Sequence, residues 1–349
     1  MNSQLVAQST QDLSGRDNVV NGKFENTEPV NMGSLGDMLR LTLRYFTEKK
    51  VHAIPDQALP VSTLTRDDLL ALSDDELHVV KFGHSSVLLK VMGEFWLLDP
   101  VFGKRASPFS FMGPKRFHNT PMTIDELPDI DKVLVSHNHY DHLDKYSVKK
   151  LVAKTKQFLV PIGVEASLEK WGVSAEKIQS FDWWQEMQTA VGKVAFTPTK
   201  HFSGRGLTDG NKSLWGSWVI DTPKGKVFFS GDSGYFAGFA EIGNRYGPFD
   251  LTFIETGAYD KDWADIHMTP EESVQAHLDL QGRVMIPIHN GTFDLAFHAW
   301  YEPLERVLAA AQTNQVVLST PRVGEVMGVM APQTQERWWQ GLIPQQLAM

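Results

Sequence analysis

Short runs of β-type residues that end close to a histidine or an aspartate are the feature that most restricts how this chain folds. The run Val133-Leu134-Val135 leads directly into a dense segment that begins at His137. Three later runs end in the same manner, with His201 after 194–196, Asp232 after 227–229 and His289 after 284–288. Loops at strand ends are where a rigid scaffold gathers functional side chains. The sequence therefore predicts a fold in which these strand ends contribute to one site.

The order of the remaining elements favours two mixed sheets. Strands are predicted first at 77–82, 86–91 and 95–98, and turn residues such as Met92-Gly93-Glu94 separate them as in a meander. Strands then alternate with helices, the strands at 157–160, 178–181, 215–220, 251–254 and 316–318 and the helices at 145–154, 164–171, 236–246, 270–281 and 302–311. This order is typical of an α/β sandwich whose outer faces are covered by helices.

The first 50 residues differ in character from the rest. Residues 1–33 are rich in Asn, Gln, Ser, Thr and Gly, which is typical of an extended arm. Within 33–50, residues at three- and four-residue steps predict an amphipathic helix packed on the body, namely Leu35, Met38, Leu39, Thr42, Tyr45 and Phe46. We therefore divide the chain into an N-terminal arm and helix at 1–50 and a catalytic domain at 51–349.

Composition excludes several classes of protein. The 349 residues carry a formal net charge of −9, so binding of nucleic acid through a basic face is not expected. Cysteine is absent, which leaves His nitrogens and carboxylate oxygens as metal ligands. The start of the chain lacks the pattern of a signal peptide, and no stretch of about 18 apolar residues occurs. We therefore expect a cytoplasmic enzyme.

The segment 137–142 holds four side chains that can ligate a metal, which are His137, His139, Asp141 and His142. His137 and His139 lie two residues apart, so they face the same way in an extended chain. Asp141 and His142 follow where Tyr140 lets the chain turn, and they can face a second ion. Two ions need more ligands than this segment supplies, and the three later strand ends provide them.

Coordination chemistry divides the ligands between two ions. Asp232 can bridge them because a carboxylate has two oxygens. The others divide into His137, His139 and His201 for the first ion and Asp141, His142 and His289 for the second. A hydroxide between the ions is then the natural nucleophile, since two cations lower the pKa of bound water. The pattern predicts a hydrolase that needs no Ser or Cys nucleophile.

The His-x-His-x-Asp-His segment, with this order of later ligands, resembles the metallo-β-lactamase superfamily. More specifically, the chain resembles N-acyl-phosphatidylethanolamine phospholipase D and its bacterial relatives. The resemblance covers residues from about Leu77 to about Glu305, and the segments that carry it are 99–100, 105–108, 112–117, 136–144, 182–184, 211–218, 231–235, 242–251, 257–259, 270–272 and 288–293. It implies an αββα sandwich with a di-metal site at one edge of the β layers.

The resemblance also implies the residues of the site. Two zinc ions, with iron or manganese able to use the same ligands, would be held by His137, His139, Asp141, His142, His201, Asp232 and His289. The family also has a histidine shortly before a Pro-Glu-Glu helix, which is His267 here. His267 would steady the phosphate or protonate the leaving group, and the alternative is a capping role before the helix at Pro270. The implied catalytic residues are therefore Asp141, Asp232 and His267.

The implied reaction is phosphodiester hydrolysis of the phospholipase D type, which gives phosphatidic acid and an N-acylethanolamine. A lactonase or esterase acting on a soluble, sugar-phosphate-like substrate is the first alternative, and a metal-bound regulatory or interaction protein is the second. Two departures from the family bear on the substrate. The run 202–207 is smaller than usual, and Glu255 stands where an apolar pair is expected.

The segment 104–117 interleaves cations with large apolar residues. Lys104, Arg105, Lys115 and Arg116 accompany Phe109, Phe111, Met112 and Phe117, and prolines and glycine break any helix. A loop that meets a lipid surface is one interpretation, and an insertion that packs its Phe residues onto the body is the other. We expect a phospholipid or another small molecule as partner, with contact at the inner membrane through 104–117, and leave open whether the chain forms a homodimer.

Overall fold

Two seven-stranded sheets lie face to face in the computed structural model, which describes residues 18–31, 33–331 and 336–344. The first sheet has the order β16 (Val326–Gly328), β3 (His78–Gly83), β4 (Ser86–Val91), β5 (Glu94–Leu98), β6 (Ile130–Leu134), β7 (Thr155–Pro161) and β8 (Ile178–Phe181). The second has the order β15 (Val317–Leu318), β14 (Gly282–Ile288), β13 (Phe249–Glu255), β12 (Gly225–Phe229), β11 (Ser217–Thr222), β10 (Gly192–Thr197) and β9 (Glu186–Thr189). The predicted sandwich of two mixed sheets is confirmed.

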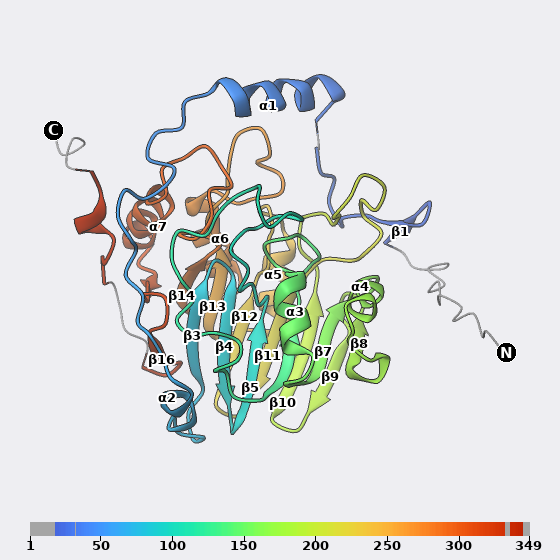
Figure 1. Cartoon of the computed structure of the whole chain (residues 1–349), viewed down its shortest axis with the longest axis vertical. Helices are drawn as coiled ribbons and strands as arrows, with labels where there is room; N and C mark the ends of the chain where they lie inside the picture. Colours follow the sequence, from blue (N-terminus) through green and yellow to red (C-terminus); the bar gives the residue numbers. More distant parts are fainter. Residues whose placement is uncertain (1–17, 32, 332–335, 345–349) are drawn as a thin grey trace.

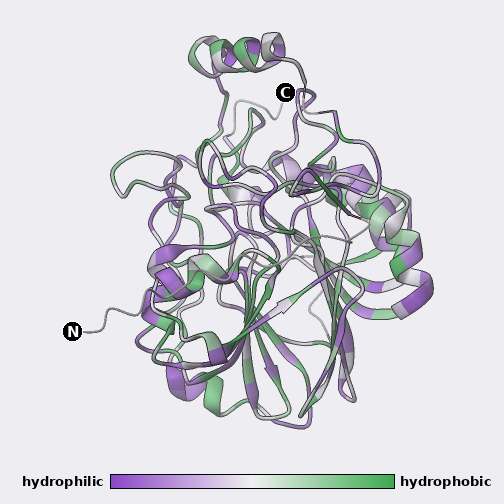
Figure 2. Ribbon diagram, turned by 90° about the vertical axis from the view of Figure 1, so that its right-hand side faces the viewer, coloured by the Kyte–Doolittle hydropathy of each residue, from purple (hydrophilic) through white to green (hydrophobic). Residues whose placement is uncertain are grey.

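Helices cover the outer faces of both sheets, as Figures 1 and 2 show. Those beside the first sheet are α3 (Lys145–Leu151) and α4 (Glu165–Lys170), and those beside the second are α5 (Gly238–Tyr246), α6 (Pro270–Asp279) and α7 (Glu302–Thr313). The smaller elements are α1 (Leu35–Thr47), α2 (Arg66–Leu70), a hairpin of β1 (Val19–Val20) and β2 (Lys23–Phe24), and 3-10 turns at Ala175–Lys177 and Gln340–Leu342.

Successive residues of the central strands enter different cores. In β5, Trp96 and Leu98 lie in the core between the sheets, whereas Leu97 packs under the outer helices. In β14, Ile286 faces the inner core and Met285 the outer one. Side chains alternate along a strand, so a strand covered on both faces is apolar throughout. This double burial explains why the central strands appear in the sequence as short, continuous apolar runs.

The parallel strands of the two sheets end at one edge of the sandwich. β5, β6, β7 and β8 pair in parallel in the first sheet, and β12, β13, β14 and β15 do so in the second. Ligands of α/β proteins bind outside the carboxyl ends of such strands. The loops after β6, β10, β12 and β14 carry the residues that the sequence predicted as ligands, and they lie at the upper edge of the sheets in Figure 1.

Helix α1 lies above this edge, apart from the helical layers (Figure 1). Its capping box at Ser34 and Asp37 begins the helix as a well-formed element. Arg44 contacts Asp260 and Asp262 of the body at 2.5 and 2.8 Å. However, Leu39 and Phe46, which the sequence predicted to face the body, are 73% and 86% exposed. The helix is held to the body through charges rather than through these apolar side chains. Residues 1–17 of the predicted arm lie outside the described residues.

Candidate metal centre

The loops at the carboxyl edge bring the predicted ligands into two adjoining groups. In each group, one ligand atom from every residue lies within 4.8 Å of the others. The first group contains His137, His139, His201 and Asp232, and the second contains His84, Asp141, His142 and His289. Except for His84, the two groups match the division expected from coordination chemistry.

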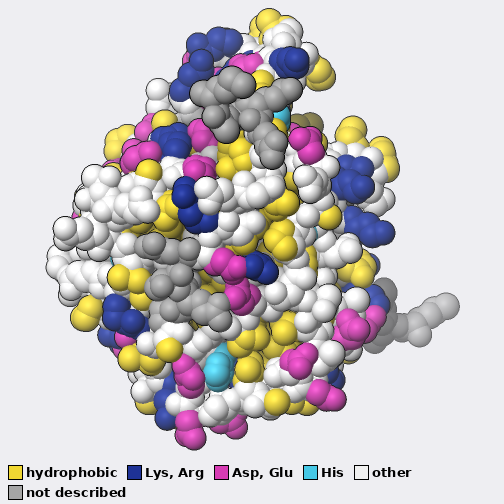
Figure 3. All heavy atoms as spheres, turned by 90° about the vertical axis from the view of Figure 1, so that its left-hand side faces the viewer, with side chains coloured by type: hydrophobic (Ala, Val, Ile, Leu, Met, Phe, Trp, Pro, Cys, Tyr) yellow, Lys and Arg dark blue, Asp and Glu magenta, His cyan; other side chains and the backbone are white. Residues whose placement is uncertain are grey.

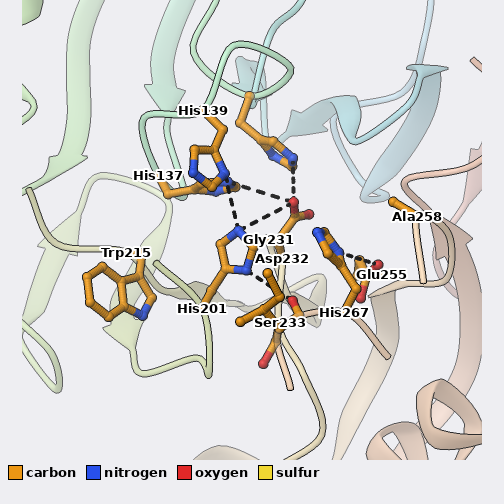
Figure 4. Close-up of polar contacts among 12 residues, drawn as sticks. His137, His139, His201, Trp215, Gly231, Asp232, Ser233, Glu255, Ala258 and His267 are labelled. Atoms are coloured by element: carbon orange, nitrogen blue, oxygen red, sulfur yellow. Dashed lines mark hydrogen bonds and ion pairs between the residues drawn. The ribbon is translucent and has the colours of Figure 1, made fainter. Parts of the chain in front are cut away.

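Three imidazole nitrogens converge in the first group, as Figure 4 shows. His139 Nδ1 lies 2.9 Å from His137 Nε2 and 3.2 Å from His201 Nε2. The Oδ2 atom of Asp232 lies 3.7 Å from His137 Nε2 and 3.9 Å from His201 Nε2. Imidazole nitrogens and a carboxylate oxygen gathered around one point form a donor set that zinc accepts.

Asp232 also reaches the second group. Its Oδ2 atom lies 3.1 Å from both His142 Nε2 and His289 Nε2. Asp141 Oδ2 lies 3.1 Å from His289 Nε2 and 3.6 Å from His142 Nε2. Asp232 therefore stands between the two groups, as a bridging ligand would.

The outer nitrogens of three histidines are held by oxygen atoms. His142 Nδ1 donates to Asp99 Oδ2 at 2.7 Å, His137 Nδ1 donates to Ser136 Oγ at 2.9 Å, and His201 Nδ1 donates to the Ile266 carbonyl at 3.0 Å. Such bonds fix the tautomer and leave the inner nitrogen free to ligate. All three rings therefore present Nε2 to the interior of the site.

Asp99 was missed as a site residue in the sequence. The side chain is fully buried, and it also accepts hydrogen bonds from the backbone N–H and the hydroxyl of Ser136. Asp99 follows β5 directly, and β5 pairs in parallel with β6. Its position directly after an apolar strand is the same signal in the sequence that indicated the later ligands.

Asn26 was also missed, and no local pattern indicates it. Its Nδ2 atom donates to the carbonyl of His201 at 2.7 Å, and its Oδ1 atom accepts from the backbone N–H of His201 at 3.0 Å. The indole N–H of Trp215 donates to the same Oδ1 atom at 3.2 Å. The lead-in segment therefore clamps a ligand-bearing loop that lies 175 residues away in sequence.

Backbone conformation at the site is strained in several places. Asp99, His84 and His289 have φ angles of 40°, 54° and 62°, in the left-handed region that non-glycine residues rarely adopt. Gly231, before Asp232, has a φ of 58°, and a Cβ there would lie 2.7 Å from Ser136 Cβ. Only glycine lets this turn pack so closely against the loop that carries His137.

Electrostatics separate the histidines of the two groups. Burial lowers the pKa of His137 and His201 well below the usual value, and it lowers that of His139 to about 4. Burial also disfavours the charged form of His289, but Asp232 and Asp141 outweigh it and raise the pKa of His289 to about 10. The first group therefore consists of neutral imidazoles, whereas in the second group the nearby carboxylates hold protons on His142 and His289, which supply the positive charge that an ion would bring.

An unpartnered oxygen of Asp232 also indicates that this group of side chains binds cations. Asp232 is 3% exposed, yet its buried Oδ1 atom has no hydrogen-bond partner among the described residues. A buried carboxylate oxygen without a partner is costly unless a cation or a water satisfies it. The free oxygen, together with the inward ring nitrogens, is the arrangement expected where Asp232 contacts two ions.

Two further histidines border the ligands. His84 donates through Nε2 to Asp141 Oδ2 at 2.9 Å, and burial lowers its pKa to about 3. His267 donates through Nδ1 to Glu255 Oε1 at 3.0 Å. The alternative that His267 caps the helix at Pro270 is wrong, because Thr269 is the N-cap of α6 and forms a capping box with Glu272.

A pocket of about 500 Å³ opens onto the site. One part of its wall is formed by ligand-type residues, including His139, Asp141, Asp232, His267 and His289. The other part is largely apolar and includes Leu41, Tyr45, Phe202, Trp263, Ile266 and Leu295. Two of these residues, Leu41 and Tyr45, belong to α1, so this helix forms part of the pocket wall.

Known proteins resemble this chain in sequence and in fold. A family profile described as a beta-lactamase superfamily domain matches residues 96–290. An uncharacterized protein of Mycobacterium tuberculosis is 41% identical over 326 residues, which are 92% of this chain and 87% of that protein. N-acyl-phosphatidylethanolamine-hydrolyzing phospholipase D 1 of Caenorhabditis elegans is 33% identical over 331 residues, which are 89% of this chain and 92% of that protein.

A solved structure agrees with the fold. Igni18, described as a novel metallo hydrolase from the hyperthermophilic archaeon Ignicoccus hospitalis, aligns with a TM-score of 0.55 at 20% identity. The alignment covers 72% of this chain and 97% of that structure. The family match, the sequence relatives and the sandwich fold all indicate the same kind of protein as the two groups of ligand-type residues, namely a metal-dependent hydrolase. The chain therefore belongs to the beta-lactamase superfamily and is a metal-dependent hydrolase of that superfamily.

Proposed function

We propose that the protein hydrolyses the phosphodiester of an N-acylated phosphatidylethanolamine and releases phosphatidic acid and an N-acylethanolamine. The pocket is the observation that carries this proposal, because it joins the ligand cluster to a largely apolar wall. A phospholipid needs both features, since its phosphate must reach the ions while its acyl chains avoid water. The activity named for the Caenorhabditis elegans relative, hydrolysis of N-acyl-phosphatidylethanolamine, supports the same substrate.

The chain's own residues would hold two ions side by side. When bound, zinc-class ions would supply an activated water and neutralise charge on the phosphoryl group. Asp232 would contact both ions, and Asp141 is the carboxylate of the second group. Asp99 and Ser136 would keep the rings of His142 and His137 in the orientation that ligation requires. No side-chain nucleophile is needed in this arrangement.

Zinc is the metal we propose. Five imidazoles and two carboxylates are borderline ligands that zinc accepts readily, although iron and manganese bind the same types. Elemental analysis of the purified protein tests the identity directly. About two zinc ions per chain are expected, and a preparation fully active with two iron ions and without zinc would contradict the proposal.

The substrate would be reached at a lipid surface. Among the described residues, no helix is long and apolar enough to cross a bilayer. In the segment 104–117, Phe109, Phe111 and Met112 are 48%, 76% and 55% exposed, and an isolated antiparallel β-bridge between the backbones of Arg105 and Lys115 holds the base of the loop. Helix α1, which projects at the top of Figures 1 and 3, also carries hydrophobic and cationic side chains side by side. Apolar tips flanked by cations suit an anionic lipid surface.

A single substitution tests this contact. Phe111→Asp places a charge on the exposed tip of the loop, so binding to vesicles of anionic lipid should weaken. Hydrolysis of detergent-dispersed lipid should stay unchanged, because the tip is not among the residues that line the pocket. Co-sedimentation with vesicles measures the effect, and Leu70→Asp on α2, which lies away from the site edge, is the control. Equal binding by both variants and the wild type would exclude the loop as the membrane contact.

The reaction itself is tested with metal-analysed protein and two substrate classes. N-acyl-phosphatidylethanolamine in mixed micelles should yield phosphatidic acid and N-acylethanolamine, detected by mass spectrometry. A panel of lactones and soluble esters should react at least tenfold more slowly in kcat/KM, a difference of about 1.4 kcal/mol. Rapid lactone hydrolysis without lipid cleavage would replace the proposal with the soluble-substrate alternative.

A further inference from the structure

Glu255 is a fully buried carboxylate at the end of β13, directly beside the candidate metal centre. Its Oε1 atom accepts from His267 Nδ1 at 3.0 Å, and its Oε2 atom accepts from the backbone N–H of Met268 at 3.1 Å. Both oxygens therefore have partners, and one of these partners is a histidine of the pocket. A buried carboxylate is retained in a core only when such bonds compensate its desolvation.

The hydrogen bond fixes the direction in which His267 faces. With Nδ1 held by Glu255, the opposite edge of the ring points toward Asp232, as Figure 4 shows. A ring nitrogen of His267 lies within 4.8 Å of ligand atoms of Asp232 and His289. The side chain is 13% exposed and lines the pocket, so a bound substrate can meet its free nitrogen.

Side chains of neighbouring elements hold the backbone of Glu255 in place. Its N–H donates to Ser230 Oγ at 2.9 Å, and its carbonyl accepts from Ser273 Oγ at 2.6 Å. In the parallel ladder of β13 and β14, Glu255 pairs with Ile288, the residue before His289. The carboxylate is thus fixed to the same two strand ends that present Asp232 and His289 to the site.

We propose that Glu255 is a positioning residue that holds His267 with Nε2–H toward the leaving-group oxygen of the substrate. The inference rests on the proposed function and extends it. Water adds its oxygen to phosphorus, the bond from phosphorus to the leaving oxygen breaks, and the bonding electrons stay on that oxygen. The leaving oxygen takes the proton from Nε2. A proton of the attacking water then returns to Nε2. Glu255 accepts the hydrogen bond from Nδ1–H throughout the reaction, and the proton stays on Nδ1, as in other acid–base dyads with a carboxylate.

The substitution Glu255→Gln changes the charge at position 255 and the tautomer of His267, but it keeps the size and the packing of the buried side chain. The N–H of Met268 can only donate, so the amide oxygen of Gln must face it. The amide NH₂ then faces His267 Nδ1 and forces that nitrogen to accept. The ring keeps its position and its Nε2–H, but it has lost the proton on Nδ1, so giving up the remaining proton would leave an unfavourable imidazolate. A loss of activity in this variant therefore reports on the dyad rather than on the fold.

Leaving groups of different quality provide the test. An alkyl leaving group needs a proton as its bond breaks, whereas a nitrophenolate leaves without one. Two phosphodiesters and two carboxylic esters are compared, each pair differing only in an alkyl or a nitrophenyl leaving group. Glu255→Gln and His267→Ala should lower kcat by about 100-fold on the alkyl substrate and by less than about threefold on the nitrophenyl substrate. The double variant should lose no more than the larger single loss, because residues that act as one unit are not additive.

A second glutamate outside the pocket provides the control variant. Glu271→Gln, on the first turn of α6 and paired with Arg306 outside the pocket, should match the wild type on all substrates. Equal losses by Glu255→Gln on both leaving groups, additive single losses, or a crystal structure in which His267 Nδ1 lacks the Glu255 contact would each overturn the inference. If the wild type cleaves only the carboxylic esters, the proposed function fails, and the dyad is still tested on the ester pair.

Discussion

At the scale of single residues, the candidate metal centre depends as much on side chains behind the ligands as on the ligands themselves. Asp99 holds His142, Ser136 holds His137, and Asn26 holds the backbone of His201. The first two contacts set which ring nitrogen faces inward before any ion is bound, and the third fixes the loop that carries His201. Partners of this kind raise the basicity of a ligand and restrict its rotation. The affinity of each ion should therefore respond to changes at residues that never touch it.

The first prediction concerns Asp99. Replacing it by Asn removes the charge that accepts from His142 Nδ1 while keeping the volume of the buried side chain. The affinity of the second ion should fall by about 10- to 100-fold, and that of the first ion should change less. Titration against a competing chelator measures both affinities. The control is Asp125→Asn, a surface carboxylate paired with Lys150. Identical metal affinities for Asp99→Asn and the wild type would show that Asp99 does not tune His142.

The second prediction concerns pH. In the metal-free protein, Asp232 and Asp141 raise the pKa of His289 to about 10, compared with about 6.5 in an unfolded chain. A raised pKa stabilises the fold below about pH 6.5, and this contribution is lost as the pH rises toward 10. Chelator-treated protein should therefore lose stability between pH 6.5 and pH 10. The metal-loaded protein should not, since an ion then replaces the proton.

Urea unfolding at several pH values in this window, with and without metal, measures the difference. The two preparations should diverge progressively as the pH rises, because the other titrating groups are common to both. Parallel pH profiles for metal-free and metal-loaded protein would contradict the assignment of a proton to this histidine.

At the scale of elements, α1 is the part of the fold whose position the sequence predicted least well. The apolar spacing indicated a helix packed on the body, but Leu39 and Phe46 are exposed, and Arg44 makes the main contacts with the loop 260–262. Tyr45 adds a ring contact with Phe297 at 4.8 Å between centroids. Spacing shows that a helix has two faces, but it does not show which face meets protein. The division of the chain at residue 50 stays a prediction.

The third prediction follows from this attachment. Arg44→Ala removes the ion pairs with Asp260 and Asp262 that hold α1 to the body. The helix should then no longer keep Leu41 and Tyr45 in the pocket wall. The KM for a long-chain lipid should rise several-fold, while kcat/KM for a short nitrophenyl phosphodiester should stay the same. Steady-state kinetics on the two substrates measure the split. Lys224→Ala, which removes a surface pair with Asp75, is the control. Equal losses on both substrates would show that α1 supports the fold rather than the lipid pocket.

At the scale of the whole molecule, the sandwich and the predicted ligands followed from one physical regularity. Central strands are buried on both faces and end at one edge, so their apolar runs and the His or Asp after them are visible in the sequence. The edge strands β9 and β16 were missed, because β9 is polar and half-exposed and β16 is short. Contacts such as Asn26 with His201 or Glu255 with His267 join distant segments, and no local pattern reports them.

We infer that seven side chains from four strand ends hold two ions, with Asp232 in contact with both. Anomalous diffraction from crystals of the metal-loaded protein tests it most directly. Two peaks are expected, one among His137, His139 and His201 and one among Asp141, His142 and His289. Each peak should lie about 2.0–2.2 Å from its ligand atoms, and Asp232 should touch both. A single peak, peaks away from these residues, or an Asp232 that contacts neither ion would show that these residues do not form a two-ion centre bridged by Asp232.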